Sequence, residues 1–233
     1  MTTALPDVTV VIIDAVEHEL SRLALVDTLN QITPGDVMII SDTPERIAGD
    51  LDVQEIEVPA IRNMQEVERV LWYLVPKHLG THFALIIQYD GWVTDGAMWR
   101  DDWQRFDYIG AKWPWHRGLR VGNGGFSLRS TRLMNYIARH QESIPVQTPE
   151  DDTLCRRYRM DLEIRCGFEW APERTAEQFS FERGPRPSQP TFGFHGIFNW
   201  PKMLCYGDLI ARMDLATDYL RSKPEWRELP EAN

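Results

Sequence analysis

The chain has 233 residues, of which 43% are hydrophobic and 26% are charged, and its formal net charge is -10 at pH 7. This composition is typical of a globular protein with a sizeable core, and the acidic balance disfavours nonspecific binding to nucleic acid. The three cysteines include no CxxC pair, which argues against a disulfide framework and suits a reducing cytosol. The first residues lack a basic and apolar leader, and no apolar run reaches the ~20 residues that cross a bilayer. We therefore expect a cytoplasmic protein without a transmembrane segment, with association at a membrane surface left open.

The first ninety residues alternate between apolar runs and amphipathic segments. Four runs have strand character: 9–14, 37–42, 53–59 and 85–91. Helical spacing predicts helices over 17–32 and 64–79, the second with Asn63 as its N-cap. This alternation predicts an α/β fold, with a central, mainly parallel mixed sheet flanked by helices. No GxGxxG follows the first strand and no GxxxxGK[ST] occurs, so a Rossmann dinucleotide site and a P-loop are both poorly supported.

Polar side chains end several of these predicted strands. Residues 85–91 read Leu-Ile-Ile-Gln-Tyr-Asp-Gly, and Asp14 and Asp42 end two earlier runs. Successive side chains of a strand point to opposite faces, so Gln88 and Asp90 share a face if the strand continues that far. They would then stand at the carboxyl edge of the sheet, where open α/β folds bind ligands. A strand followed by an ordinary polar turn is the alternative explanation.

The second half has a different character. Five of the nine tryptophans fall between positions 92 and 115, interleaved with charged residues. That mixture argues against complete burial and favours stacking on a sugar ring or another flat ligand, although core packing is the alternative. We also expect a short strand over 106–111, a helix capped by Ser130, an extended segment over 168–181 and a closing helix over 207–221. Residues 224–233 are expected to be a flexible tail.

Acidic residues gather at 150–152, where the chain reads Glu-Asp-Asp after Thr148 and Pro149. A helix that begins there would have Thr148 as its N-cap, with acids in its first turn that are stabilised by the helix dipole. Three consecutive acids exceed what capping requires and repel one another, so a catalytic base at the helix start is an equal alternative.

His195 lies in the sequence Phe-Gly-Phe-His-Gly at 192–196. In a strand the two phenylalanines share one face and His195 takes the other, with glycines on either side of the motif leaving it space. A lone histidine is more often structural than a ligand. Together with Asp90, however, it would supply a nitrogen and an oxygen ligand for Mn²⁺ or another divalent ion.

The order of these motifs resembles that of a known family. The chain reads Gln-Tyr-Asp-Gly at 88–91, Phe-Asp-Tyr-Ile-Gly-Ala at 106–111 and Gly-Asn-Gly-Gly-Phe-Ser-Leu-Arg-Ser at 122–130. The acidic segment and the late Phe-Gly-Phe-His-Gly then follow. This order resembles a family of uncharacterised glycosyltransferase-like domains of GT-A type. Their layout is similar to that of galactosyltransferases with a DxD motif, a Gly-Gly acceptor loop, a Glu-Asp pair and a late His. The resemblance extends from about Val8 to Trp200 and implies a single domain over 1–233, with a nucleotide-binding half (8–91) and an acceptor and catalytic half (92–205).

The resemblance also implies roles for individual residues. Asp90 matches the last Asp of DxD and, with His195, would hold a divalent cation, Mn²⁺ or Mg²⁺. Gln88 replaces the first Asp of DxD, which puts the metal requirement in doubt. Asp151 matches the base of inverting members. The resemblance further places Glu150 and Asp152 beside the base, Asp14 and Asp42 at the nucleoside, and Asn123, Gly124 and Gly125 in the acceptor-side loop. Apart from the resemblance, Lys112 and Arg183 are expected to help neutralise the leaving diphosphate of the donor, and Trp92 and Trp113 to stack on the acceptor.

These expectations describe a glycosyltransferase that moves a sugar from a nucleotide-diphosphate donor, such as a UDP-sugar, to a glycan, a glycolipid or another hydroxyl acceptor. Such a transfer needs a neutralised leaving diphosphate and a carboxylate that takes the acceptor's proton. Two alternatives stay open. One is a metal-dependent hydrolase or nucleotidyltransferase that uses Asp90, Asp151 and Asp152, and the other is a non-catalytic carbohydrate-binding module.

Overall fold

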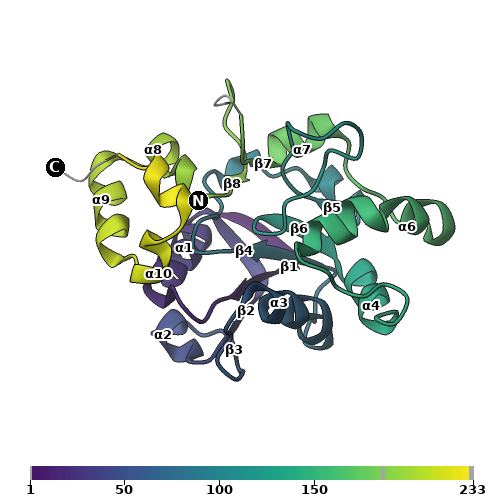
Figure 1. The fold of residues 1–233 in the computed structure, drawn as a ribbon, viewed down its shortest axis with the longest axis horizontal. Helices are drawn as coiled ribbons and strands as arrows, with labels where there is room; N and C mark the ends of the chain where they lie inside the picture. The colour runs from purple at the N-terminus through teal and green to yellow at the C-terminus, as the bar shows by residue number, and fades with distance from the viewer. Residues whose placement is uncertain (1, 185–186, 231–233) are drawn as a thin grey trace.

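A central six-stranded sheet organises the molecule (Figure 1), in the order β3-β2-β1-β4-β6-β5. The computed structural model describes residues 2–184 and 187–230. The strands of this sheet are β1 (Thr3–Ile13), β2 (Ile32–Ser41), β3 (Gln54–Glu57), β4 (Phe83–Ile87), β5 (Tyr108–Ile109) and β6 (Ser127–Ser130). The first four are mutually parallel, whereas β6 is antiparallel to both β4 and β5. A small second sheet pairs β7 (Ser180–Phe181) in parallel with β8 (Gly193–Phe194). The predicted α/β fold with a mainly parallel mixed sheet is confirmed.

Helices cover both faces of the sheet. They are α1 (His18–Gln31), α2 (Pro44–Ala48), α3 (Met64–Arg69), α4 (Thr131–Arg139), α5 (Glu150–Asp152), α6 (Arg159–Cys166), α7 (Glu173–Phe179), α8 (Trp200–Met203), α9 (Tyr206–Leu215) and α10 (Asp218–Arg221). The expected caps are confirmed, because the Asn63 side chain accepts from the backbone N–H of Glu66 and that of Ser130 from Leu133. No helix in the described part of the chain has the length and apolar character needed to cross a membrane.

The strand period of two places a core on each face of the sheet. In β1, Val10 and Ile12 join the core that includes Leu25 of α1, while Val11 faces the opposite core with Leu133 of α4. All five residues of β4 are buried, as expected for a strand covered on both faces. The C-terminal helices α8 to α10 form a third cluster beside α1 (Figure 1). Both cores therefore hold the carboxyl ends of β1 and β4 in a fixed position.

Several local predictions were wrong. Thr148 is not an N-cap, because Pro149 occupies that position and the Thr148 hydroxyl donates to Glu68 instead. The segment predicted as extended over 168–181 contains α7, and the closing helix is broken between α9 and α10. Within the segment predicted to be a flexible tail, Pro224–Glu228 forms a 3-10 helix and Leu229 is buried. Residues 231–233 lie outside the described residues.

Candidate active site

A tight turn follows β4 and carries the first two predicted site residues. Gln88 and Gly91 exchange backbone hydrogen bonds of 3.1 and 3.0 Å, so regular strand geometry ends at Ile87. The turn nevertheless directs both polar side chains to one place. Gln88 Oε1 lies 3.2 Å and Asp90 Oδ1 3.4 Å from Nε2 of His195. The structure thus brings Gln88, Asp90 and His195 together.

His195 is fixed by the small sheet and surrounded by polar groups. It follows β8, and its backbone N–H donates to the carbonyl of Phe181 in β7 at 2.9 Å. Its Nδ1 lies 3.1 Å from the Asn123 amide nitrogen and 3.4 Å from Glu182 Oε1. Burial alone would lower the pKa of the imidazole, but the Asp90 and Glu182 carboxylates outweigh it and raise the pKa to about 10. Glu182, which the sequence did not single out, therefore belongs to this site.

The glycine-rich segment 122–125 packs directly against His195. Asn123 has a positive φ of 72°, which asparagine tolerates better than most residues, and its Oδ1 accepts from the Phe126 N–H at 3.1 Å. A Cβ on Gly125 would lie 2.0 Å from His195 Nε2 and 2.7 Å from Gln88 Oε1. Glycine at 125 is required because the backbone passes too close to the imidazole for any side chain.

Replacing Gly125 by Ala is accordingly expected to lower the free energy of unfolding by about 1–3 kcal/mol, the range for overpacking a filled site. The matched control is Gly80→Ala, since a Cβ there meets no atom within 4 Å. That variant should change the free energy by less than about 1 kcal/mol. Denaturant unfolding of both variants tests this, and equal stabilities would show that His195 yields to the added methyl without penalty.

The three consecutive acids diverge in their environments. Glu150 is buried and forms a two-pronged ion pair with Arg129, at 2.6 and 3.0 Å, while also accepting from Trp72 Nε1 at 2.8 Å. Asp152 points away and pairs with Arg156 and Arg157. This separation removes Asp152 from the acidic set that the hydrolase or nucleotidyltransferase alternative requires.

Asp151 is the acid of this run that joins the glycine-rich segment. Its Oδ2 accepts from the Gly124 N–H at 3.0 Å, and its Oδ1 accepts from the Asp152 N–H at 2.8 Å. Burial, followed by the charge of Glu150, raises the pKa of Asp151 to about 6. A carboxyl with a pKa near neutrality is suited to taking a proton in general base catalysis.

The predicted donor residues have different surroundings. The Asp14 carboxylate accepts from the backbone N–H of Val16 and of Glu17 at 2.8 and 3.1 Å, at the start of α1. Asp42 contacts His18 Nε2 at 3.0 Å. Lys112 and Arg183 are both paired with carboxylates, Lys112 with Glu177 at 2.6 Å and Arg183 with Glu228 at 3.1 Å. Of these four residues, Asp14 lines a cavity that Gln88 also lines.

The expectation of open aromatic faces at Trp92 and Trp113 is wrong. Trp92 is 3% exposed, packs edge-to-face on Phe194 at 4.5 Å and lies beneath the Arg212 guanidinium. Trp113 is 4% exposed. Trp115, by contrast, is 54% exposed. The burial of Trp92 and Trp113 weakens the carbohydrate-binding-module alternative, which relied on open rings.

A cavity of about 250 Å³ lies at the carboxyl end of β1. We call it the β1 cavity; its lining includes Asp14, Val16, Arg62, Met64, Gln88, Tyr89, Tyr219 and Lys223. Val16, Met64 and Tyr219 are large apolar residues that are more than one-third exposed. Neither Arg62 nor Lys223 forms an ion pair with any described residue. The lining therefore combines apolar side chains, two tyrosines and two cations without an ion-pair partner among the described residues with the carboxyl groups of Asp14 and Glu17.

Sequence reasoning did not identify Arg62, Tyr219 and Lys223 as cavity residues. Tyr219 lies in α10, and Lys223 lies two residues beyond the end of that helix. Both are more than 120 positions after Gln88 in the sequence. The carboxylate of Glu17 accepts from the backbone N–H of Thr217 at 3.2 Å and so ties this segment to the start of α1. No local pattern in the sequence indicates that long-range contact.

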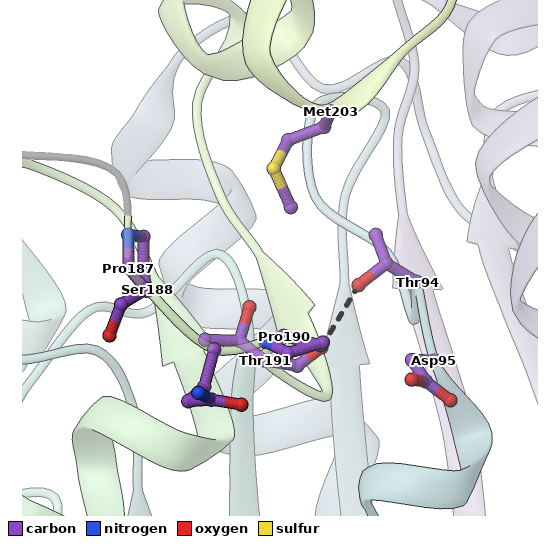
Figure 2. Close-up of a pocket in the computed structure, with 8 residues that line it drawn as sticks. Thr94, Asp95, Pro187, Ser188, Pro190, Thr191 and Met203 are labelled. Carbon is purple, nitrogen blue, oxygen red and sulfur yellow. Dashed lines mark hydrogen bonds between the residues drawn. The ribbon is translucent and has the colours of Figure 1, made fainter.

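Two larger cavities lie on either side of residues 187–190. One, of about 520 Å³, is lined by Thr94, Asp95, Met203 and the 187–191 segment, and the Thr94 hydroxyl donates to the Thr191 carbonyl at 3.1 Å (Figure 2). It contains none of the predicted site residues. The other, of about 560 Å³, is lined by Lys112, Ser180, Glu182 and Arg183, among others. Because Glu182 contacts His195, this second cavity adjoins the candidate site.

The residues around His195 fit part of a divalent metal site. Asp90 Oδ1 is buried and makes no hydrogen bond within the described residues, and Gln88 Oε1 and His195 Nε2 face it. Glu182 Oε1 lies behind the ring at Nδ1, where a carboxylate typically orients a ligating imidazole. In the ranges 2–184 and 187–230, no group of three or more His, Cys, Asp or Glu residues is arranged to hold a metal. The protein thus offers one carboxylate, one imidazole and an amide oxygen, a set that a bound ligand's oxygens would complete.

Several solved structures share this fold. The galactosyltransferase LgtC, solved with donor and acceptor sugar analogs, superposes with a TM-score of 0.52 at 14% identity, over 95% of this chain and 100% of that one. A glycosyltransferase involved in glycosylation of the major capsid of PBCV-1 gives 0.52 at 9% identity, over 89% and 97%. Mannosyltransferase PcManGT from Pyrobaculum calidifontis, in complex with GDP-Man and Mn²⁺, gives 0.51 at 14% identity, over 72% of this chain and 56% of that one. At these identities the likeness establishes the fold, which is that of GT-A glycosyltransferases.

No curated protein matches the sequence. A family model does match, over residues 51–195, and this range includes the β4 turn, the glycine-rich segment, the three acids and His195. The match covers more than half of the chain. The chain belongs to the family described as protein of unknown function DUF5672, with the fold of a GT-A glycosyltransferase.

Proposed function

We propose that this protein is a glycosyltransferase that moves a sugar from a nucleotide-diphosphate donor to a hydroxyl of a glycan or glycolipid. The observation that carries the proposal is the convergence of Gln88 and Asp90 on His195 at the carboxyl end of β4. Gln88 also lines the β1 cavity, so the polar cluster and that cavity are continuous. Open α/β sheets bind ligands at this edge.

The β1 cavity is the proposed donor site. The tyrosines and apolar side chains would hold a base and ribose, and Arg62 and Lys223 would attract the diphosphate. A UDP-sugar is the donor that we propose. Asp14 lines the cavity and fixes the turn before α1, because its carboxylate accepts from the Val16 and Glu17 N–H groups. Asp42 and Lys112 are engaged by neighbouring side chains and are less suited to bind the donor.

Asp90 and His195 are the proposed ligands of a divalent cation, with Gln88 as an oxygen donor. Such an ion, Mn²⁺ or Mg²⁺, would neutralise the charge of a leaving diphosphate. Asp90 Oδ1 is buried, accepts no hydrogen bond from the described residues and lies 3.4 Å from His195 Nε2, and Glu182 contacts the imidazole at Nδ1. Because His195 has a raised pKa, it must lose a proton before it can bind a cation.

Asp151 is the proposed base. Its carboxylate would take the proton of the acceptor hydroxyl, held in place by the Gly124 N–H and the Asp152 N–H. A single displacement at the anomeric carbon would invert the configuration. Glu150 and Asp152 act as structural neighbours, one in a buried ion pair and the other at the surface.

Thermal unfolding with UDP tests the donor and metal assignments together. We expect UDP to raise the melting temperature in the presence of Mn²⁺, and Asp90→Ala and His195→Ala each to reduce this shift by more than half. Asp42→Ala serves as a matched control, because Asp42 is an acid at the end of a neighbouring strand that does not line the β1 cavity. An undiminished UDP shift in the presence of a chelator would contradict the metal assignment, and no shift with any nucleotide would contradict the donor site.

A further inference from the structure

The cavity of about 560 Å³ beside β7 has a composition that differs from that of the β1 cavity. We call it the β7 cavity. It is lined by Ser180 and Glu182, by Lys112 and Arg120, and by the apolar side chains of Met98 and Pro114, among others. Ser180 and Glu182 are separated by one residue, and Phe181 between them joins the third apolar cluster. All three residues line the cavity, and Ser180 and Glu182 are its polar members in this stretch.

Two oxygen atoms in this lining have no hydrogen-bond partner among the described residues. They are Ser180 Oγ and Glu182 Oε2, and both are shielded from water. Ser180 as a whole is 3% exposed. A buried polar atom without a partner destabilises the fold by roughly 1–3 kcal/mol. A ligand that supplied the missing hydrogen bond to either oxygen would recover part of that free energy.

The cations of the β7 cavity are already neutralised. Lys112 pairs with Glu173 at 3.0 Å and Glu177 at 2.6 Å, Arg120 with Glu173 at 3.3 Å, and Arg183 with Glu228 at 3.1 Å. In the β1 cavity, by contrast, Arg62 and Lys223 have no such partner among the residues described. A phosphate or carboxylate that entered the β7 cavity would have to displace a protein carboxylate and would face the charge of Glu182.

The unpaired atoms also define what a ligand must offer. A carboxylate oxygen accepts hydrogen bonds, and a serine hydroxyl donates one and accepts others. A ligand hydroxyl group can donate a hydrogen bond to the Glu182 carboxylate and can donate to or accept from the Ser180 hydroxyl. An anionic oxygen has no proton to donate to Glu182. Met98 and Pro114 add the apolar surface against which the C–H face of a sugar ring packs.

We propose that the β7 cavity is an acceptor subsite that takes an uncharged sugar ring through hydrogen bonds to Ser180 and Glu182. This rests on the function proposed above and specifies its acceptor class. The cavity is close to the chemistry, because Glu182 contacts His195 at 3.4 Å, and its charge contributes to the raised pKa of Asp151. An acceptor held there would lie beside Glu182 and so next to the His195 cluster.

Saturation-transfer NMR on the full chain tests the subsite, with neutral methyl glycosides of glucose, galactose and mannose as probes and glucuronate and glucose 6-phosphate as anionic counterparts. We expect a neutral glycoside to bind and the anionic sugars to bind at least tenfold more weakly. Ser180→Ala should weaken the neutral glycoside about 3- to 10-fold, the range for one lost hydrogen bond. Ser143→Ala, at an exposed serine on another face, is the control and should bind as the unchanged protein does.

The outcomes separate this inference from the proposed function. Equal or tighter binding of the anionic sugars, or identical binding by the Ser180→Ala and Ser143→Ala variants, would overturn the subsite. UDP thermal shifts measured on the same samples report on the donor site. A normal UDP shift with no Ser180-dependent glycoside binding refutes the subsite alone. Ser180-dependent binding of a neutral glycoside without any nucleotide binding would support a sugar site in the β7 cavity but refute the transferase, and with it the acceptor role of that site.

Discussion

The substitution Asp151→Asn is expected to lower sugar transfer at pH 7 by about 10²- to 10⁴-fold, the contribution of a positioned general base. The amide keeps the shape of the carboxyl group and one oxygen to accept from the Gly124 N–H. It has no basic site with which to take the acceptor's proton. The measurement is the initial rate of transfer from a UDP-sugar, and a variant that retained full activity would contradict the base assignment.

The pH dependence of transfer gives a second measure of the same residue. With a pKa of about 6, Asp151 is protonated and inactive as a base below that pH. The kcat/KM of the unchanged protein should therefore fall about tenfold per pH unit below 6, and the residual activity of the Asn variant should lack that acid limb. An acid limb that persists in the variant would assign the titration to another group.

The Asp151→Asn substitution should raise the free energy of unfolding near neutral pH, although it lowers the rate of transfer. The pKa of Asp151 rises from an ordinary 3.8 to about 6 on folding, so between these values the native protein holds more protons than the unfolded chain. The ionisation of Asp151 therefore lowers the free energy of unfolding of the unchanged protein as the pH rises through this window. The Asn variant has no ionisable group at this position, so its free energy of unfolding lacks that decrease. Relative to the unchanged protein, the variant should gain up to about 3 kcal/mol between pH 4 and pH 7. Urea unfolding across this range tests it, with Asp152→Asn as the control.

The sheet and the parts of the site that follow from local patterns were predictable. Continuous apolar runs indicated β1, β2 and β4, and the turn after β4 placed Gln88 and Asp90 at the expected edge. The caps Asn63 and Ser130 were also readable, because a capping side chain bonds to a backbone group three residues away. In each case the deciding interaction is short in sequence.

Features that depend on distant partners were not predictable. Trp92 and Trp113 lie among charged residues in the sequence, yet Trp92 is covered by Phe194 and Arg212, about 100 positions further on. Glu182 lies beside His195 because β7 pairs with β8. Each of these strands has two residues, which is too short for a periodic pattern to appear in the sequence. Likewise, the choice between capping and catalysis for the three acids depended on Arg129, a buried partner from β6.

The pair formed by Arg129 and Glu150 is expected to carry a large share of the stability of this region. Both side chains are buried, and their charged atoms are 2.6 and 3.0 Å apart. Arg129→Met would leave Glu150 as an unpaired buried charge, so we expect a loss of about 3–5 kcal/mol in the free energy of unfolding. Arg157→Met, which breaks the more exposed pair with Asp152, is the matched control and should lose less than about 1 kcal/mol.

A second substitution separates the loss of a charge partner from a general packing defect. In Arg129→Met/Glu150→Gln the buried charge is gone, and the glutamine oxygen can still accept from Trp72 Nε1. We therefore expect the double variant to regain at least half of the stability that the single variant loses. The charge of Glu150 also helps to raise the pKa of Asp151, so the acid limb of transfer should move below pH 6 in the double variant. If stability returned while that limb stayed in place, Glu150 would support the fold without tuning the proposed base.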